Sequence, residues 1–408
     1  MSDKPTKQRI EIIDALRGFS LAGIVIVHFV ENFIGSAVPQ NVLEGLHVGP
    51  MDYVVDAFIA LFLRGKFFAL FSFLFGLSFF IQMDNAQEKG TYFGPRFLWR
   101  VIILLLIGGL HHMFYRGDIL TIYALLGVFL IPFYKLSNKW VLGVAAILFL
   151  GMGRFLVFAI AQGETIFSPG GIMPDDPEAL AYFNILENGS LKDVIVSNST
   201  IGHLNKLEFQ FGVFGRGYLT FGFFLLGLYT GRIGFFLKLQ ENKKLIKKVL
   251  IGSIILFVVS IVLTALIFMQ LGQNVTFDNW PAMAGLTAFD LNNIAMTFIL
   301  ITLFVMGYKK VKGRKWLGKF APYGRMALTN YVSQTLLGTF LFFGWGLGYL
   351  VELRNSYTFL ISILVIIVQM LLSKWWLAKF QYGPLEWLWR SITFFKWYPL
   401  RKRVQGDF

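Results

Sequence analysis

The sequence predicts an all-α, polytopic integral membrane protein with about ten transmembrane helices and with both termini in the cytoplasm. Of its 408 residues, 56% are hydrophobic and only 15% are charged, and the mean hydropathy is +0.63. A soluble domain needs considerably more charge on its surface. The chain contains no cysteine, which excludes disulfides, thiolate metal sites and a cysteine nucleophile.

Ten apolar runs are long enough to cross the hydrocarbon core of a bilayer, which is about 30 Å thick. They cover residues 15–34, 66–83, 97–115, 118–134, 139–162, 211–232, 247–271, 285–308, 326–350 and 357–378. Residues 51–63 are expected to form a short interfacial or re-entrant helix. The runs divide the chain into an N-terminal five-span half (1–162), an outer loop or cap (163–210) and a C-terminal half with a cytoplasmic tail (211–408).

The distribution of lysine and arginine sets the predicted orientation. With the N-terminus inside, 28 of the 37 basic residues fall in cytoplasmic segments, and only Arg116, Lys192, Lys206 and Arg354 fall in outer loops. Cytoplasmic loops of membrane proteins carry this excess of positive charge. The net charge of +14 therefore reflects membrane topology, and we expect a lipid bilayer rather than a nucleic acid as the partner.

The first apolar run carries polar residues on one face of its predicted helix. Asp14, Arg17 and His28 are separated by steps of three and four that keep them in register with Leu21 and Ile24. Arg17 and His28 are 11 residues apart, roughly 16 Å along the helix axis. Topology puts Arg17 near the cytoplasmic face and His28 in the outer half. Polar groups inside a bilayer are costly unless paired or hydrated, so they usually mark function.

Polar residues from other runs share the outer depth of His28. They are Lys66, His111, His112, Asp118, Arg154 and Arg216. Neighbouring helical residues point about 100° apart, so at most one of the two adjacent histidines should face a given site. The sequence shows no His-Glu-x-x-His pattern or other metal-ligand spacing, and we expect no metal.

Each of these residues also has a purely structural interpretation. His28 could be a packing residue that hydrogen-bonds to a neighbouring helix. Arg17 could extend to the interface as an anchor, or form only an i,i+3 ion pair with Asp14. Asp118 precedes an apolar run and could simply cap the N-terminus of the next helix.

Several segments resemble known families. Arg17 and His28 match the Arg-x10-His motif on the first helix of the type-3 membrane acyltransferases. Four longer segments look like the YeiB family of bacterial membrane proteins, whose C-terminal half is a domain of unknown function (DUF 418). These segments are residues 65–76, 111–124, 324–331 and 382–390, and the resemblance extends from about residue 9 to 397.

This resemblance implies an activity, because the family is grouped with the type-3 acyltransferases and heparan-glucosaminide acetyltransferase. It implies transfer of an acyl group, most simply acetyl, from cytoplasmic acyl-CoA to an extracytoplasmic hydroxyl of an envelope glycan or lipid-linked sugar. The protein would then be a multi-pass protein of a bacterial plasma membrane. Many members carry Asn at the position of His28, so His111 is the rival general base.

The expected roles follow from side-chain chemistry. A histidine suits a general base because its pKa lies near neutrality, and arginine forks match phosphate oxygens. We expect His28, His111, His112 and Asp118 to be the catalytic candidates. Lys66, Arg154, Arg216 and Asn32 would contact the substrate or its oxyanion. Arg9, Arg17, Arg96, Arg100 and Arg325 would bind acyl-CoA.

Two other classes fit the same composition. The protein could be a transporter or flippase for a small metabolite or lipid, or a non-enzymatic membrane protein, and a homo-oligomer is compatible with each. Transport would favour paired discontinuous helices, which are not evident in the sequence.

Overall fold

The structure, a computed structural model, describes residues 10–39, 42, 46–169, 173–174, 176–272 and 275–402. Arg9, one of the predicted acyl-CoA ligands, lies outside this part of the chain. Within it the fold is all-helical, as predicted, and the one β contact is an isolated bridge between Phe380 and Arg401.

The helices follow one another with short connections. They are α1 (Glu11–Val30), α3 (Pro50–Phe58), the π-helix η1 (Ile59–Leu63), α4 (Phe67–Gln87), α5 (Gly94–Phe114), α6 (Leu120–Phe133), α7 (Asn138–Phe149), α8 (Met152–Ala161), α9 (Pro177–Asn188), α10 (Leu191–Ser199), α11 (Ile201–Phe211), α12 (Arg216–Arg232), α13 (Lys243–Leu271), α14 (Trp280–Tyr308), α15 (Val311–Leu317), α16 (Phe320–Arg325), α17 (Ala327–Phe342), α18 (Asn355–Lys379) and α19 (Pro384–Phe394).

Six helical units among the described residues are long and apolar enough to cross a membrane. They are α1, the α3–η1–α4 unit, α5, α13, α14 and α18. The number rises to eight if the bent pairs α7–α8 and α11–α12 each count as one span. This supports a multi-pass membrane protein. The two other predicted runs form α6, with 14 residues, and α17, with 16 residues, so the count of ten stays a prediction.

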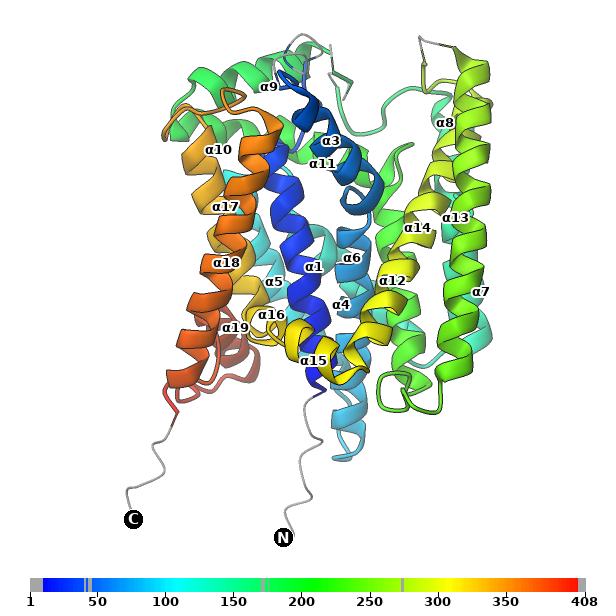
Figure 1. Ribbon diagram of the computed structural model, residues 1–408, viewed down its shortest axis with the longest axis vertical. Helices are drawn as coiled ribbons and strands as arrows, with labels where there is room; N and C mark the ends of the chain where they lie inside the picture. The colour runs from blue at the N-terminus through cyan, green and yellow to red at the C-terminus, as the bar shows by residue number, and fades with distance from the viewer. Residues whose placement is uncertain are drawn as a thin grey trace.

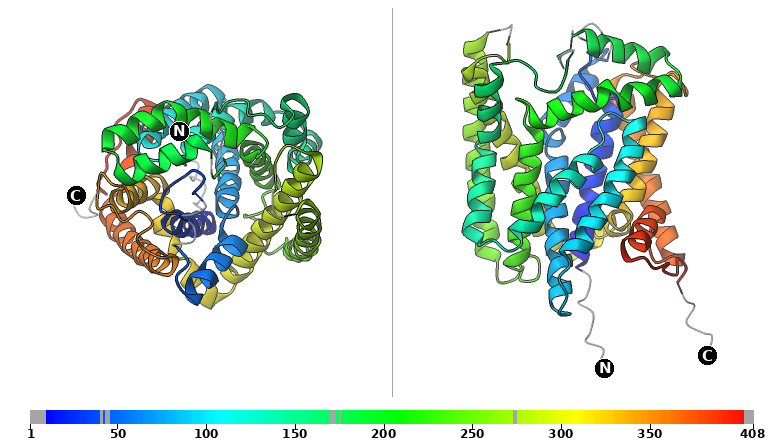
Figure 2. Two further views of the ribbon diagram at one scale, coloured as in Figure 1. Left: turned by 90° about the horizontal axis from the view of Figure 1, so that it is seen from above. Right: turned by 180° about the vertical axis from the view of Figure 1, so that it is seen from behind.

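The bundle is arranged around α1, which the view from above shows surrounded by other helices (Figure 2). Helices α13 and α14 lie with α7 and α8 at one edge, and α17, α18 and α19 lie at the other (Figure 1). The start of α1 and helix α19 lie at the same end of the bundle, opposite α9 and α10. That this end faces the cytoplasm remains a prediction from charge.

Glycines allow helix backbones to touch where the core is tightest. A Cβ at Gly76 of α4 would lie 2.0 Å from the Phe224 carbonyl oxygen of α12, and one at Gly227 would lie 2.0 Å from that of Phe73. At Gly324 of α16 it would lie 2.0 Å from a carbonyl oxygen of α1. Small residues are typical of such close crossings in membrane bundles.

Two helix pairs of the structure are bent at a break. The predicted span 139–162 bends by 52° between α7 and α8, where Gly151 takes a left-handed φ of +77°. Helices α11 and α12 meet at 59° near the start of the predicted span 211–232, with Gly215 at φ +64°. Discontinuous helices are therefore present, although none was evident in the sequence.

Among the described residues, the segment 163–210, which was predicted to be an outer loop or cap, folds into α9, α10 and part of α11. Arg116, in the turn after α5, fixes these helices because its guanidinium stacks 3.3 Å above the ring centre of Tyr182. It also donates to Ser197 Oγ at 3.1 Å and pairs with Glu178 at 3.3 Å. The segment is thus an ordered helical cover over the end of α5.

At the opposite end, α19 holds the start of α17. The Glu386 carboxylate accepts hydrogen bonds from the backbone N–H groups of Leu328 and Thr329, at 2.7 and 3.1 Å, and from the Thr329 hydroxyl at 2.6 Å. These contacts cap the first turn of α17. Burial raises the pKa of the Glu386 carboxyl, against the lowering effect of its hydrogen bonds.

Candidate functional site

His111 and Asp118 form a buried pair where α5 passes into α6. His111 lies in the last turn of α5, and its Nδ1 is 2.7 Å from Asp118 Oδ1. Asp118 also accepts from the backbone N–H groups of Leu120 and Thr121, so it caps α6 as well. The one carboxylate of Asp118 therefore contacts both the histidine and the first backbone N–H groups of α6.

The contact fixes which ring nitrogen of His111 faces Asp118. An ionised carboxylate only accepts hydrogen bonds, so in contact with ionised Asp118 the Nδ1 of His111 is the nitrogen that carries the proton. The other ring nitrogen, Nε2, is buried and has no hydrogen-bond partner in the described part of the chain. Lys206 of α11 lies 3.8 Å from Asp118 Oδ2 and donates to Thr121 Oγ1 at 2.7 Å, which helps to keep Asp118 ionised. The arrangement leaves a basic nitrogen directed away from its carboxylate.

His28 lies in the same neighbourhood. Its ring centre is 5.1 Å from that of Tyr115 and 6.1 Å from that of Tyr331, and the ring centre of His111 is 5.0 Å from that of Tyr331. The two histidines thus share aromatic neighbours from α5 and α17. His28 Nδ1 is buried without a hydrogen-bond partner, so the side chain is turned into the bundle and away from lipid.

Two further polar side chains belong to this neighbourhood. The Tyr331 hydroxyl is buried beside the Ile119 backbone but forms no well-shaped hydrogen bond. One turn along α17, Gln334 is fully buried, and neither of its amide atoms has a hydrogen-bond partner among the described residues. Residues three apart share a helix face, so Gln334 lies on the same face of α17 as Tyr331.

His112 and Asn32 are engaged elsewhere. His112 faces the outer cover, with its Nε2 2.9 Å from the Asn198 carbonyl oxygen and its ring 5.8 Å from that of His203. Asn32 takes a left-handed φ of +49° after α1 and donates to the Val30 carbonyl at 3.1 Å. Its position stabilises the end of α1.

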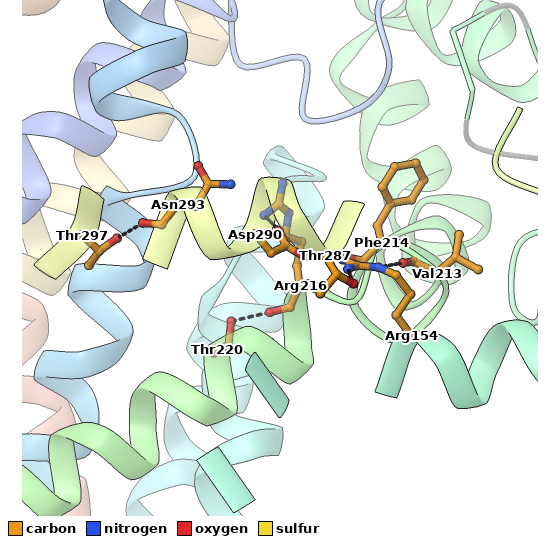
Figure 3. A network of polar contacts seen from close by, with 9 residues as sticks. All are labelled: Arg154, Val213, Phe214, Arg216, Thr220, Thr287, Asp290, Asn293 and Thr297. Carbon is orange, nitrogen blue, oxygen red and sulfur yellow. Dashed lines mark hydrogen bonds and ion pairs between the residues drawn. The ribbon is translucent and has the colours of Figure 1, made fainter. Parts of the chain in front are cut away.

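A second polar centre surrounds Asp290 in the middle of α14 (Figure 3). One carboxylate oxygen pairs with Arg154 of α8, and the other accepts from Arg216 of α12 at 2.9 Å. Asp290 is 2% exposed and Arg154 is 3% exposed. Among the described residues, neither guanidinium hydrogen-bonds to or forms an ion pair with His28 or His111.

Arg154 also satisfies the backbone at the break between α11 and α12. It donates to the carbonyl oxygens of Val213 and Phe214, at 2.6 and 3.0 Å, and to Thr287 Oγ1 at 2.7 Å. Backbone freed from a helix at membrane depth needs partners inside the protein. Each of the three guanidinium nitrogens of Arg154 thus donates to another group of the protein.

Lys66 and Asn293 adjoin this centre. Lys66 is 1% exposed and donates to the Ala60 carbonyl of the π-helix η1 at 2.6 Å. The positive charges of Arg216 and Arg64 repel a positive charge on the Lys66 amine. Asn293, one turn after Asp290, is 2% exposed, and neither its Oδ1 nor its Nδ2 has a hydrogen-bond partner among the residues that the structure describes.

Basic residues also gather at the opposite end of the bundle. Arg100 experiences electrostatic repulsion from two other guanidinium groups, those of Arg390 and Arg17. Its own guanidinium stacks 3.6 Å above the ring centre of Trp389. Arg17 itself pairs with Asp14 at 2.9 Å, as the i,i+3 interpretation expected, and donates to Ser78 Oγ at 3.0 Å.

The other two predicted acyl-CoA ligands border this cluster. Arg96 donates to the Thr393 carbonyl at 2.9 Å, and Arg325 reaches the Gln381 carbonyl at 3.5 Å. Both contacts tie α5 or α16 to the α18–α19 segment. Arg390 was not among the predicted ligands, although it ends one of the segments that carried the family resemblance.

Asp290, Asn293, Tyr331, Gln334 and Lys206 were not singled out from the sequence. Asp290 could have been, because a carboxylate within an apolar run of membrane-spanning length is costly and marks a buried partner. No local pattern identifies Tyr331 or Gln334, since their meaning depends on which helix faces them. In the described part of the chain, no three His, Asp or Glu side chains are grouped to hold a metal ion.

Two known families match separate parts of the chain. Residues 9–186 match the family described as heparan-alpha-glucosaminide N-acetyltransferase, catalytic. Residues 230–396 match the family described as protein of unknown function (DUF418). Fold and comparisons together define an all-helical, acyltransferase-like membrane protein.

Full-length relatives are found in bacteria. The uncharacterized protein YxaH of Bacillus subtilis is 29% identical, with 98% of each chain covered. The uncharacterized protein YeiB of Escherichia coli is 27% identical, with 95% of this chain and 96% of the relative covered. Over nearly its whole length the chain is thus similar to the YeiB and YxaH proteins, and its C-terminal half is similar to the DUF418 family, as the resemblance predicted.

Proposed function

We propose that the protein transfers an acyl group, most simply acetyl, from acyl-CoA to a hydroxyl of an envelope glycan or lipid-linked sugar. The observation that carries the proposal is the His111–Asp118 pair, whose Nε2 is buried, unpaired and adjacent to His28 and Tyr331. A histidine oriented by a carboxylate is a typical general base. The match of residues 9–186 to an acetyltransferase catalytic family supports this reaction class.

The reaction uses this pair as follows. The acceptor oxygen attacks the thioester carbonyl carbon while His111 Nε2 takes the hydroxyl proton. The carbon–sulfur bond then breaks, and the imidazolium returns the proton to the thiolate, so that an ester and free CoA are released. His28 and the Tyr331 hydroxyl supply donors near the reacting oxygen.

Acyl-CoA, the acyl donor, is proposed to enter from the end of α1 that is opposite His28. Arg17, Arg100 and Arg390 bring three guanidinium groups together, and one nearby carboxylate, Asp14, is paired with Arg17. Such a cluster suits the phosphates of CoA. The roughly 16 Å between Arg17 and His28 along α1 would be spanned by the flexible arm that carries the thioester.

The test is transfer of radiolabel from acetyl-CoA in membranes that contain the protein. Wild type should yield a labelled product, and His111→Asn should yield none. Arg100→Gln should need a higher acetyl-CoA concentration for half-maximal transfer. His203→Gln is the matched control, because this histidine lies at the outer cover. Unchanged transfer by His111→Asn would refute the histidine-base mechanism.

Anion transport is a second candidate, favoured by the breaks at α7–α8 and α11–α12. Discontinuous helices with their N-termini around a mid-bundle site are typical of secondary transporters. Proteoliposomes that move a labelled anion without consuming acetyl-CoA would favour transport over acyl transfer.

A further inference from the structure

The Asp290 centre holds more positive than negative charge. Arg154 and Arg216 contribute two positive charges against the one negative charge of Asp290, and the buried Lys66 amine adjoins them. The adjacent Arg64 has its own partners, since it pairs with Glu31 at 2.6 Å and with Asp56 at 3.4 Å. Buried charge without compensation is strongly unfavourable, so the excess of positive charge calls for an anionic partner.

Helix ends increase this positive potential. Lys66 is the N-cap of α4, Arg154 lies in the first turn of α8, and Arg216 is the first residue of α12. The N-terminus of a helix is the positive end of its dipole, where acidic rather than basic residues are favourable. Two of these ends arise at the helix breaks, which therefore direct positive potential at the same centre.

Asn293 provides an independent sign of a missing ligand. Both of its amide atoms are buried and unpaired, which is costly to maintain in a folded protein. The amide packs flat against Gly65, because a Cβ there would lie 3.1 to 3.2 Å from its carbon, oxygen and nitrogen. Figure 3 shows the Asn293 amide and the Arg216 guanidinium extending to the same side of α14.

We propose that Lys66, Arg216 and Asn293 bind a phosphate group. The ammonium of Lys66 has three donors and spends one on Ala60, so two are free for an anion. The guanidinium fork of Arg216 fits phosphate oxygens and its side chain is 18% exposed, which makes it reachable. Helix N-termini bind phosphate by the same electrostatics. The excess positive charge of the two guanidinium groups over the one carboxylate favours an anion such as phosphate.

This inference goes beyond the proposed function, because it uses none of the histidines and holds whether or not acyl transfer occurs. The phosphate can belong to a lipid headgroup or be free in solution, and the experiment separates these sources. Purified full-length protein is placed in phosphatidylcholine nanodiscs, in nanodiscs that also contain phosphatidic acid, or in phosphatidylcholine nanodiscs with inorganic phosphate. Ligand that binds the native state raises the melting temperature.

We expect phosphatidic acid, inorganic phosphate or both to raise the melting temperature of wild type. Lys66→Met and Asn293→Leu should weaken that binding at least tenfold. Asn293→Leu should still fold, because replacing an unpaired buried amide with an apolar side chain of similar size costs little. Arg314→Gln, at an exposed cytoplasmic-side arginine, is the control for charge alone.

A response to phosphatidic acid alone assigns the site to a lipid headgroup, and a response to inorganic phosphate assigns it to the free anion. The proposal is overturned if neither ligand shifts wild type, or if Asn293→Leu and Lys66→Met respond as strongly as wild type. An equal loss in Arg314→Gln would also overturn it, because the effect would then follow net charge.

Discussion

The charge of Asp290 should hold the helix breaks together, and Asp290→Asn tests this. The substitution keeps the shape of the side chain but leaves Arg154, 3% exposed, and Arg216, with 18% of its side chain exposed, without a counter-charge. Removing one partner of a buried ion pair costs about 3–5 kcal/mol. Because Arg216 is partly exposed and Arg154 keeps its carbonyl partners, we expect about 3 kcal/mol, the lower end of that range.

The assay is reversible unfolding of the purified protein in mixed detergent micelles, without added phosphate. The double variant Asp290→Asn/Arg216→Gln should recover part of the loss, and the double-mutant cycle should give a coupling of about 0.5–3 kcal/mol. A free energy of unfolding within about 1 kcal/mol of wild type for Asp290→Asn would refute the reasoning.

Glu11→Gln is the matched control for the loss of a carboxylate charge. Glu11 pairs with Arg314 at 3.1 Å, but the two side chains are 51% and 65% exposed. Water screens such a pair, so we expect no measurable change. A loss equal to that of Asp290→Asn would mean that the assay follows net charge and not burial.

Three further predictions concern other parts of the molecule. If acyl transfer is the reaction, His111→Asn should lower kcat by about 10²–10⁴-fold. His112→Gln should keep a kcat within a few-fold of wild type, because the ring of His112 faces α10 and not the His111–Asp118 pair. Measurement of kcat and KM in the transfer assay checks both predictions. Gly324→Ala should lower the free energy of unfolding by about 1–3 kcal/mol, since its Cβ would lie 2.0 Å from a carbonyl oxygen of α1, and Gly109→Ala, with nothing within 4 Å, should not. Burial raises the pKa of the Glu386 carboxyl in the folded state above its ordinary value of 4.5, so the folded state favours the protonated form. The contribution of Glu386 to the free energy of unfolding should therefore fall as the pH rises above 4.5. Unfolding experiments at several pH values should show a weaker dependence of the free energy of unfolding on pH for Glu386→Gln.

The helical elements were largely predictable from the sequence, because the preference of an apolar run for the bilayer is a local property. Each of the ten predicted runs overlaps a helix or a bent helix pair of the structure. The breaks were not predictable, since a glycine within an apolar run is equally compatible with a continuous membrane helix. The break before α12 is stabilised by Arg154, which lies about 60 residues earlier in the chain.

The candidate site was predictable in its parts. His28, His111 and Asp118 stood out because they are polar residues in apolar surroundings, and the His111–Asp118 pair spans only seven residues. The sequence could not decide whether His111 or His112 faces the site, because helical geometry requires only that two adjacent side chains point in different directions. Packing against α17 places the ring of Tyr331 next to His111 and His28.

By itself, therefore, the sequence determined the class of protein, its helices and its likeness to the YeiB family. Hydropathy and charge bias act residue by residue against the bilayer, so they can be evaluated along the chain. Only the tertiary structure decided that Asp290 joins Arg154 and Arg216, which are 136 and 74 residues away. An ion pair depends on side-chain distances of a few ångströms, and helix packing alone sets those.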